Sequence, residues 1–407
     1  MLALEGIKVL DLSRVLAGPL CTMTLGDLGA DVWKVESPIS GDDTRTWSPP
    51  EIGGQATYYL SANRNKRSMA LDLKAPEGQA VVRRLIALAD VLVENMKFGT
   101  LDKLGLGWKD AEAINPRLIY CSISGYGRES PNRQLPGYDV IAQAESGLMS
   151  ITGETGGEPL KHGMAIVDIA TGFNATQAIL AALFARERSG RGQFIDMALL
   201  DTGIAMLANT GTGFINAGAT PPRWGNAHPT IVPYQVFGAA DGTFVLGCGN
   251  DSQYRLLAEK VISRPDLAKN PLFARNRDRV QNREELVGLL TEIFAREPAG
   301  RWVELLNNAG IPAGRVRDMD EVFTSADAQE RGTVVEQPHP TIGSVRTIAS
   351  PLRLHGTPPQ YRRPPPLLGE HTEELLSDIL GMSGSEIDRL LATGVVRGTH
   401  DKQLQVP

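Results

Sequence analysis

The sequence predicts an α/β protein with a large, mostly parallel sheet and a second, smaller α/β domain. Strand-like and helix-like segments alternate through residues 1–209, which is typical of a doubly wound sheet. The length of 407 residues exceeds that of one ordinary domain. The alternation stops near residue 210 and resumes near residue 241, which indicates a domain boundary between these positions.

The N-terminus has the pattern of a βαβ unit. Ile7–Leu12 and Asp31–Glu36 are predicted strands, and Arg14–Gly29 is predicted to be a loop followed by a helix. The turn after the first strand is SRVLAGPL and lacks the glycine fingerprint GxGxxG of dinucleotide-binding proteins. The sequence therefore disfavours a nicotinamide-dependent oxidoreductase.

The alternation continues with a strand at Met69–Leu73, a helix at Pro76–Ala89, and strands at Val91–Asn95 and Arg117–Ser124. Cations flank the first of these strands, and they have two interpretations. They form a solvated face, or they bind a phosphate-rich ligand at the end of a parallel strand. The cations are Arg64, Lys66, Arg67 and Lys74.

The stretch from Lys161 to Asp201 contains the clearest helix, with Asp168 at its beginning and Gly190 as its C-terminal stop. Asp168 has two interpretations. It caps the helix, which this stretch alone favours because Asp is a leading N-cap residue. Alternatively, the helix dipole keeps its carboxylate ionised, and the carboxylate attacks an acyl carbonyl to form a mixed anhydride. The apolar residues at roughly helical spacing are Ile169, Phe173, Ile179, Leu180, Leu183 and Phe184.

The second half of the chain has a different character. Thr210–Pro233 shows little periodicity and is predicted to be a linker with an ordered loop at Gly225–Pro229. His228 in this loop is a hydrogen-bonded loop residue or a candidate catalyst. A strand and helices after Asp241 indicate the smaller domain, and the proline-rich Thr333–Glu370 is expected to be an ordered arm that returns the chain to another part of the molecule.

Composition narrows the class of protein. The net charge of −6 argues against a nucleic-acid partner. Cys21, Cys121 and Cys248 lie far apart, so neither a metal site nor a disulfide framework is expected, and a reducing compartment fits. We find no signal-type N-terminus and no apolar stretch long enough to span a membrane, so we expect a cytoplasmic protein without a membrane partner.

Taken together, these segments resemble the class III CoA-transferases, the family of formyl-CoA transferase and carnitine CoA-transferase. The resemblance covers essentially the whole chain, and its specificity comes from the order of several motifs. The stretches that carry it are GIKVLDLSRVLAGPLCTMTLGDLGADVWKVE, NKRSMALDLKAPEG, VLVENMKFGTLDKLGLG, NPRLIYCSISGYG, PGYD, the central VDIATG with the later SGRGQ, GIPAGRV and LLGEHT.

The resemblance implies a fold. A large Rossmann-like, CoA-binding domain would be built from both ends of the chain, and two ring-like subunits would interlock into a homodimer. Residues 1–209 would form the N-terminal part of the large domain, 210–240 a linker with an active-site loop, 241–330 the small domain, and 331–407 the return arm and the C-terminal part of the large domain.

The resemblance also implies a chemistry and makes Asp168 the catalytic nucleophile. Asp168 would attack the thioester of an acyl-CoA, pass through a mixed anhydride and an aspartyl–CoA thioester, and transfer CoA to a small carboxylic acid. The CoA thioester is a substrate, and no permanently bound cofactor is expected. The expected partners are these substrates and a second copy of the chain.

The resemblance also implies which residues contact CoA, because positions of this sequence match the family's CoA-binding positions. The active-site loop would be the counterpart of the family's glycine-rich loop and includes Gly225, Asn226 and His228. Lys103 stands where arginine is common in the family. The expected CoA-binding residues are Val15, Leu16, Ala17, Leu71, Lys74, Asn95, Met96, Lys103, Leu104 and Tyr138.

Two further alternatives share the implied fold. An α-methylacyl-CoA racemase needs two opposed acid/base groups, one of them a histidine in a GHD turn. This sequence has Gly137, Tyr138 and Asp139 there, and tyrosine is a poor base at neutral pH. A non-catalytic CoA-binding protein would not need Asp168. We therefore expect a transferase.

Overall fold

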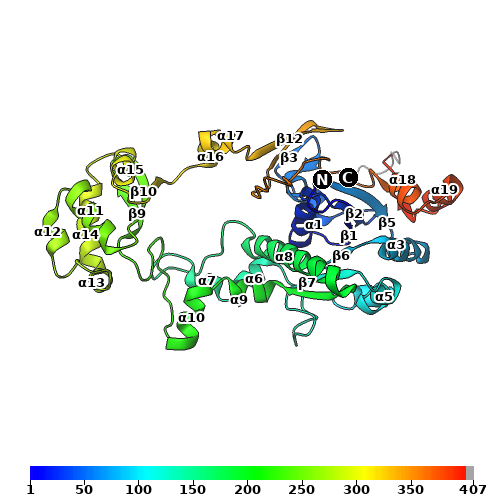
Figure 1. The fold of residues 1–407 in the computed structure, drawn as a ribbon, viewed down its shortest axis with the longest axis horizontal. Coiled ribbons are helices and arrows are strands. Elements are labelled where there is room, and N and C mark those ends of the chain that lie inside the picture. Colours follow the sequence, from blue (N-terminus) through cyan, green and yellow to red (C-terminus); the bar gives the residue numbers. More distant parts are fainter. Residues whose placement is uncertain (400–407) are drawn as a thin grey trace. The chain divides into compact units, whose positions relative to one another are not determined.

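The computed structural model describes residues 1–399. The chain divides into two compact units. The first comprises Met1–Leu148, Lys161–Ala217 and the chain from Asp327 onward, and the second comprises Met149–Leu160 and Gly218–Ala326. The first contains a large parallel-dominated sheet with helices, which confirms the predicted α/β class (Figure 1).

The helices and strands between residues 8 and 217 follow the predicted alternation. They are β1 (Lys8–Asp11), α1 (Ala17–Asp27), β2 (Asp31–Glu36), β3 (Glu51–Ile52), β4 (Gln55–Ala56), α2 (Thr57–Ser61), β5 (Lys66–Leu71), α3 (Pro76–Leu88), β6 (Val91–Glu94), α4 (Thr100–Lys103), α5 (Trp108–Ile114), β7 (Ile119–Ser124), α6 (Asp139–Glu145), α7 (Leu148–Ile151), α8 (Ile166–Ser189), β8 (Phe194–Ala198), α9 (Leu199–Ala205) and α10 (Ala208–Ala217).

The remaining elements belong to the second unit and to the return of the chain. They are β9 (Tyr234–Ala239), β10 (Gly242–Gly247), α11 (Asp251–Leu256), α12 (Pro265–Lys269), α13 (Asn276–Gln281), α14 (Arg283–Phe294), α15 (Ala299–Asn308), β11 (Ala313–Arg315), α16 (Met319–Thr324), α17 (Ala326–Glu330), β12 (Val334–His339), β13 (Gly343–Ile348), α18 (Thr372–Glu374), α19 (Gly384–Ala392) and β14 (Val396–Arg397).

The large sheet has the order β14-β5-β2-β1-β6-β7-β8, and every neighbouring pair except β14–β5 is parallel. Counted along the chain, the six parallel strands therefore have the order 3-2-1-4-5-6. The direction of winding reverses between β1 and β6, where Val9 pairs with both Val32 and Val91. Ligands of open α/β sheets bind at the carboxyl ends of the strands beside such a reversal.

Both faces of this sheet are buried. Successive side chains of a strand point to opposite faces, so neighbouring residues belong to different clusters. Leu10 and Leu92 lie in a cluster with Val82 and Leu85 of α3. Val9 and Val91 lie in a second cluster with residues of α1 and α8. Helices therefore cover the two faces as a doubly wound sheet requires.

Helices α1 and α8 approach each other closely. A Cβ atom at Gly172 would lie 2.8 Å from the carbonyl oxygen of Ala17, so only glycine permits this packing. Small residues of α8 make the contact, and the predicted apolar face is partly wrong, because the side chains of Phe173 and Phe184 are 42% and 62% exposed. Gly190 ends the helix in the left-handed conformation, as predicted.

The length and apolar composition of α8 also contradict one expectation. With 24 residues it is long and apolar enough to cross a membrane by these two criteria alone. Val167, Ala175 and Ile179 of this helix are fully buried in the core between α1 and the sheet. In this structure, α8 is a core helix of the first unit.

The chain after residue 327 returns to the first unit. The Arg362 guanidinium donates hydrogen bonds to the carbonyl oxygens of Gly26 and Ala30 at 3.0 and 2.8 Å, and β14 adds an antiparallel edge strand to β5.

Within the segment 210–240, which was predicted to be a linker, the structure instead shows the end of α10 and the strand β9.

The second unit is built on the antiparallel sheet β11-β10-β9. An aromatic cluster joins this sheet to α14 and α15. Phe294 meets Phe237, Phe244 and Trp302 in edge-to-face contacts with ring centroids 5.0 to 5.1 Å apart.

Candidate active site

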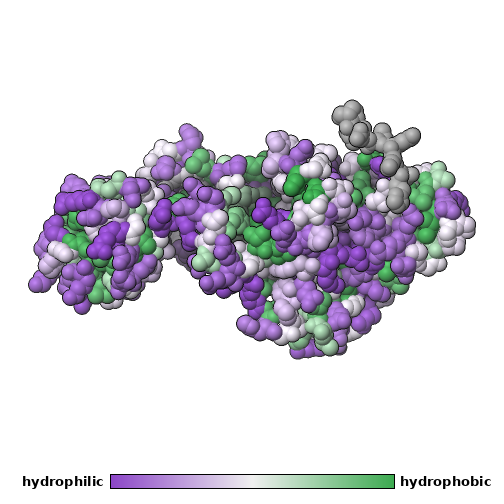
Figure 2. Space-filling view, turned by 90° about the horizontal axis from the view of Figure 1, so that it is seen from above, coloured by the Kyte–Doolittle hydropathy of each residue, from purple (hydrophilic) through white to green (hydrophobic). Residues whose placement is uncertain are grey.

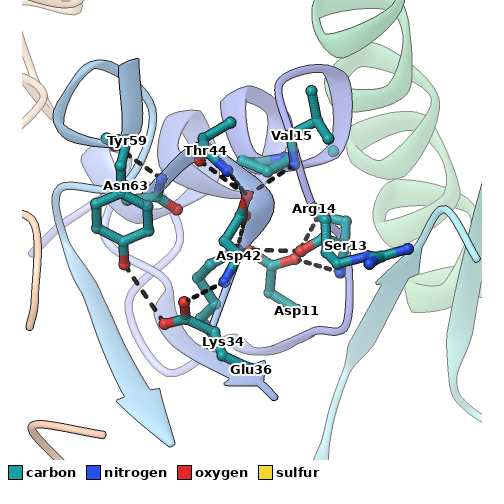
Figure 3. A network of polar contacts seen from close by, with 12 residues as sticks. Asp11, Ser13, Arg14, Val15, Lys34, Glu36, Asp42, Thr44, Tyr59 and Asn63 are labelled. Atoms are coloured by element: carbon teal, nitrogen blue, oxygen red, sulfur yellow. Dashed lines mark hydrogen bonds and ion pairs between the residues drawn. The ribbon is translucent and has the colours of Figure 1, made fainter. Parts of the chain in front are cut away.

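The turn after β1 is held in a strained conformation. Val15 has a φ of 71°, which is a rare value for a β-branched residue. Its backbone N–H donates to the Asp42 carboxylate at 3.2 Å, and this carboxylate also accepts from Lys34 Nζ at 2.9 Å and from Thr44 (Figure 3). A buried network of charged and polar groups thus holds the backbone of this turn in place.

The same turn is fixed from its other side by Asn95, which follows β6. The Asn95 side chain accepts from the Arg14 backbone N–H at 2.9 Å and donates to the Arg14 carbonyl oxygen at 2.7 Å. The carboxyl ends of β1 and β6 are therefore joined beside the reversal in the winding of the sheet.

A hollow of about 220 Å³, called here the first hollow, opens at these strand ends. It extends along the end of β7 to the first turn of α8. Three cations and two acids lie on its wall. Its lining residues are Arg14, Val15, Leu16, Ala17, Asp43, Asn95, Met96, Lys97, Phe98, Ile123, Ser124, Gly125, Arg133, Leu135, Pro136, Gly137, Tyr138, Asp168 and Leu199.

Asp168 lies in the first turn of α8, but it does not cap the helix. The N-cap position is Ala165, and the carboxylate of Asp139 accepts the backbone N–H groups of Val167 at 2.8 Å and Asp168 at 3.1 Å. The N-cap interpretation of Asp168 is thus wrong, because Asp139 from the start of α6 performs this role. Within residues 1–399, no hydrogen bond reaches the Asp168 carboxylate, which is left available for chemistry.

The expectation that Asp168 stays firmly ionised is also wrong. Burial and the negative charge of Asp139 raise the pKa of Asp168 to about 7. Asp139 itself is held in place, because Gln143 Nε2 donates to its second oxygen at 2.6 Å and Gln143 Oε1 accepts from the backbone N–H of His162 at 2.7 Å. At neutral pH, Asp168 is therefore poised between its neutral and charged forms.

A second hollow of about 550 Å³ also has Asp168 in its wall. The rings of Trp47 and Tyr58 meet edge to face in its wall, with centroids 5.1 Å apart. Burial, Asp168 and Asp139 raise the pKa of Tyr58, so its hydroxyl stays a hydrogen-bond donor. The lining residues are Val15, Leu16, Trp47, Tyr58, Ser61, Tyr138, Asp139, Val140, Lys161, Gly163, Met164, Ala165, Asp168 and Ile169.

The structure brings together seven of the eleven predicted catalytic and CoA-binding residues and separates the other four. Seven of the predicted residues line the first hollow, namely Val15, Leu16, Ala17, Asn95, Met96, Tyr138 and Asp168. Leu71, Lys74, Lys103 and Leu104 are not among its lining residues. Leu71 is buried in the core, and Lys74 and Lys103 are exposed near the ends of β5 and α4.

The predicted loop residues Gly225, Asn226 and His228 belong to the second unit. His228 is well bonded, since its backbone N–H donates to the Tyr234 carbonyl at 2.9 Å and its ring nitrogen accepts from the Thr230 N–H at 3.1 Å. Within residues 1–399, no group of three His, Cys, Asp or Glu side chains could hold a metal ion.

Three of the cations near β5 are neither solvated nor available to a phosphate. Arg64, Lys66 and Arg67 are buried, and they form ion pairs with Asp27, Asp11 and Asp31 respectively. Both sequence interpretations of these residues were wrong, because each arginine or lysine has an acidic partner from α1, β1 or β2.

Sequence reasoning also missed Trp47, Tyr58 and Lys161. Trp47 lies in an irregular segment without periodicity, Tyr58 comes shortly after it, and Lys161 carries no motif. No signal in the single sequence marks them, because only the fold places them beside Asp168.

Comparison with known proteins places these features in a family. Residues 4–372 match the model of CoA-transferase family III. The chain is 44% identical over 393 residues to human succinyl-CoA:glutarate CoA-transferase, covering 97% of this chain and 90% of that one. It is 42% identical over 382 residues to succinate–glutarate CoA-transferase of Agrobacterium fabrum, covering 92% and 95%.

A solved structure agrees with these matches. The crystal structure of a CAIB/BAIF family protein from Brucella suis superposes with a TM-score of 0.82 at 42% identity, and covers 92% of this chain and 99% of that one. The alignments extend over both units and include the strand ends that form the site. The chain therefore belongs to CoA-transferase family III.

Proposed function

We propose that this protein transfers CoA from an acyl-CoA thioester to a small carboxylic acid, with Asp168 as the covalent nucleophile. The observation that carries this proposal is the Asp168 carboxylate, which receives no hydrogen bond from residues 1–399 and lines both hollows. Membership of the family supports transfer between an acyl-CoA and an acid. The relatives' names include succinyl-CoA with glutarate and acetyl-CoA with oxalate as substrate pairs.

The proposed reaction consists of paired displacements. An oxygen of the Asp168 carboxylate bonds to the thioester carbonyl carbon, the carbon–sulfur bond breaks, and CoA thiolate leaves. The thiolate then attacks the aspartyl carbonyl of the mixed anhydride, which gives an aspartyl–CoA thioester and releases the donor acid. The acceptor carboxylate repeats the two steps in reverse order and restores Asp168. No proton leaves the α-carbon, and the electron pairs balance at every step.

The first hollow supports the binding of the CoA thioester. Its wall carries Arg14, Lys97 and Arg133, and cations of this kind suit the phosphate groups of CoA. The 3-2-1-4-5-6 order of parallel strands supports the Rossmann-like character proposed for the large domain. Leu71, Lys74, Lys103 and Leu104 stay predicted contacts of the more distant part of CoA.

The homodimer and the loop also belong to the proposal. Apolar side chains are exposed on α8 and α10, among them Phe184, Phe214 and Ile215, and burial in an interface with a second copy would remove them from water. Figure 2 shows apolar side chains among hydrophilic ones on one face of the molecule. The loop at Gly225–Pro229 is proposed to exclude water from the anhydride. The cytoplasmic location stays a prediction, and the three free, buried cysteines are consistent with it.

An assay of purified protein with a panel of CoA thioesters and carboxylates, read by mass spectrometry, tests the function. We expect CoA to appear on an acceptor acid, and Asp168→Ala to lower this transfer by at least ~10³-fold while the protein stays folded. The exposed Asp110 on α5 provides a matched control, since Asp110→Ala should transfer CoA at the wild-type rate. Near wild-type turnover by Asp168→Ala would refute the nucleophile.

The same assay in deuterated water separates transfer from racemisation. A chiral 2-methylacyl-CoA should keep its α-hydrogen during transfer. Rapid deuterium uptake with loss of stereochemistry, together with no transfer to any acid, would instead assign the protein to the racemases.

A further inference from the structure

The second hollow has a distribution of charge that the transfer chemistry alone does not require. Asp139 and Asp168 provide its negative charge, and Lys161 is the single cation among the described residues that line it. The remaining lining side chains are apolar, aromatic or hydroxyl-bearing. The first hollow differs, because three cations lie on its wall.

Lys161 is available to a ligand. Its ammonium donates one hydrogen bond, to the carbonyl oxygen of His162 at 3.2 Å, and its side chain is exposed. It forms no ion pair with an acidic residue in the described part of the chain, in contrast to Lys34 and Lys66. A lysine with two further hydrogen-bond donors and no acidic partner among the described residues can hold a carboxylate that enters the hollow.

We propose that Lys161 is a specificity-determining residue that binds the distal carboxylate of a short dicarboxylic acid. The near carboxylate of the same acid would attack the side-chain carbonyl carbon of the Asp168–CoA thioester and displace CoA thiolate, and the carbon chain between the two carboxylates would lie along Trp47 and Tyr58. This inference deepens the proposed function and rests on it, since it assigns the acid class to the site around Asp168.

The charges at the second hollow at the moment when the acceptor acid binds favour a role for Lys161. When the acceptor acid binds, Asp168 is esterified to CoA sulfur and carries no charge. Asp139 then provides the negative charge nearest to the acid, and its two oxygens already accept hydrogen bonds from Gln143 and from the start of α8. Lys161 offsets this charge at the same hollow. A monocarboxylic acid has no distal carboxylate for Lys161 to bind.

The test compares two acceptors of equal chain length in the intact enzyme, glutarate and its monomethyl ester, with succinyl-CoA as donor. The measured quantity is the ratio of kcat/KM for glutarate to kcat/KM for the ester. Lys161→Met removes the charge and keeps the approximate length of the side chain. We expect the ratio to fall on the order of tenfold, mainly through a higher KM for glutarate, because one charged hydrogen bond is lost.

Two further variants separate charge from structure. Lys161→Arg keeps the charge and should retain most of the ratio. Lys109→Met removes an exposed lysine on α5, outside both hollows, and should leave the ratio at the wild-type value. An unchanged ratio in Lys161→Met would overturn the inference. An equal loss with glutarate and with the ester would also overturn it, because Lys161 would then not distinguish an acid with a distal carboxylate from one without it.

Failure of the proposed function gives a different result. If the wild-type enzyme transferred CoA to neither glutarate nor its ester nor any other acid in the panel, the transferase proposal itself would fail. If the wild type used the ester as well as glutarate, the function would stand and the role of Lys161 would be refuted.

Discussion

Two groups of acids in the first unit have opposite electrostatic surroundings. Behind the turn after β1, Asp11 and Asp42 are fully buried and each pairs with a buried lysine, Lys66 at 3.0 Å and Lys34 at 2.9 Å. Burial raises the pKa of these acids, but the lysines overcome this effect, lower the pKa of Asp11 and bring that of Asp42 to about 2. At the start of α8, Asp168 and Asp139 lie together, and the pKa of Asp168 rises to about 7.

The comparison separates acids that support the structure from the acid proposed to react. The paired acids fix the backbone that carries Val15, and their charges are compensated. Among the described residues, no cation forms an ion pair with Asp168, and its carboxylate is correspondingly more basic. A half-buried acid beside a second acid, at the reversal of an α/β sheet, is thus the feature that distinguishes the reacting residue here.

The largest expected effect on stability comes from breaking a compensated pair. Lys66→Met leaves the buried Asp11 charge without its partner and should reduce the free energy of unfolding by about 3–5 kcal/mol. Chemical denaturation measures this loss, and Lys109→Met should change the same quantity by less than ~0.5 kcal/mol. Combining Lys66→Met with Asp11→Asn should recover part of the loss. A loss below about 1 kcal/mol in Lys66→Met would show that the pair is not a structural requirement.

The pH dependence of kcat/KM tests the effect of Asp139 on Asp168. Only ionised Asp168 is a nucleophile, so kcat/KM should rise between pH 6 and pH 8 with an apparent pKa near 7. Asp139→Asn removes the neighbouring negative charge while keeping an acceptor for the N–H groups of α8. The rise should therefore move to lower pH, with a several-fold gain relative to the wild type at pH 6. An unchanged profile would mean that Asp139 does not set the basicity of Asp168.

Tyr138 tests whether a neighbouring hydroxyl assists the uncompensated acid. Its side chain is 59% exposed and lines both hollows, where the hydroxyl could donate to a carbonyl oxygen of the substrate. Tyr138→Phe should lower kcat/KM by roughly tenfold, the effect of one hydrogen bond worth about 1.4 kcal/mol. Full activity in Tyr138→Phe would restrict this residue to a contact without a role in the transition state.

The smallest expected effect concerns the folded state, which the buried Asp168 carboxylate destabilises when it is ionised. Burial and Asp139 raise the pKa of Asp168 from its ordinary value of 3.8 to about 7 in the folded protein. The folded state therefore binds the proton more tightly, and unfolding becomes easier as pH rises from about 4 to about 7. Asp168→Asn removes this cost and should raise the Tm at pH 8 by roughly 2–4 °C, and by less at pH 5, after allowance for solvent screening. A lower Tm at pH 8 would contradict the assigned surroundings of Asp168.

The alternation of elements could be predicted from the sequence because buried parallel strands and amphipathic helices leave clear local patterns. Asp31–Glu36 forms β2 with the predicted bounds, and α3 ends one residue before its prediction. The partners of Asp168 could not be predicted, because Asp139 reaches it across 29 residues of chain through the fold alone. For the same reason, Lys66 appeared free in the sequence and is paired with Asp11 across 55 residues.

Trapping of the acyl-enzyme tests the central claim most directly. The protein would be incubated with succinyl-CoA and hydroxylamine, digested, and examined by mass spectrometry. The claim predicts a hydroxamate on the peptide that contains Asp168, in proportion to the loss of activity and absent from Asp168→Asn. Continued transfer with no modification of Asp168, or a hydroxamate on another acid, would contradict it.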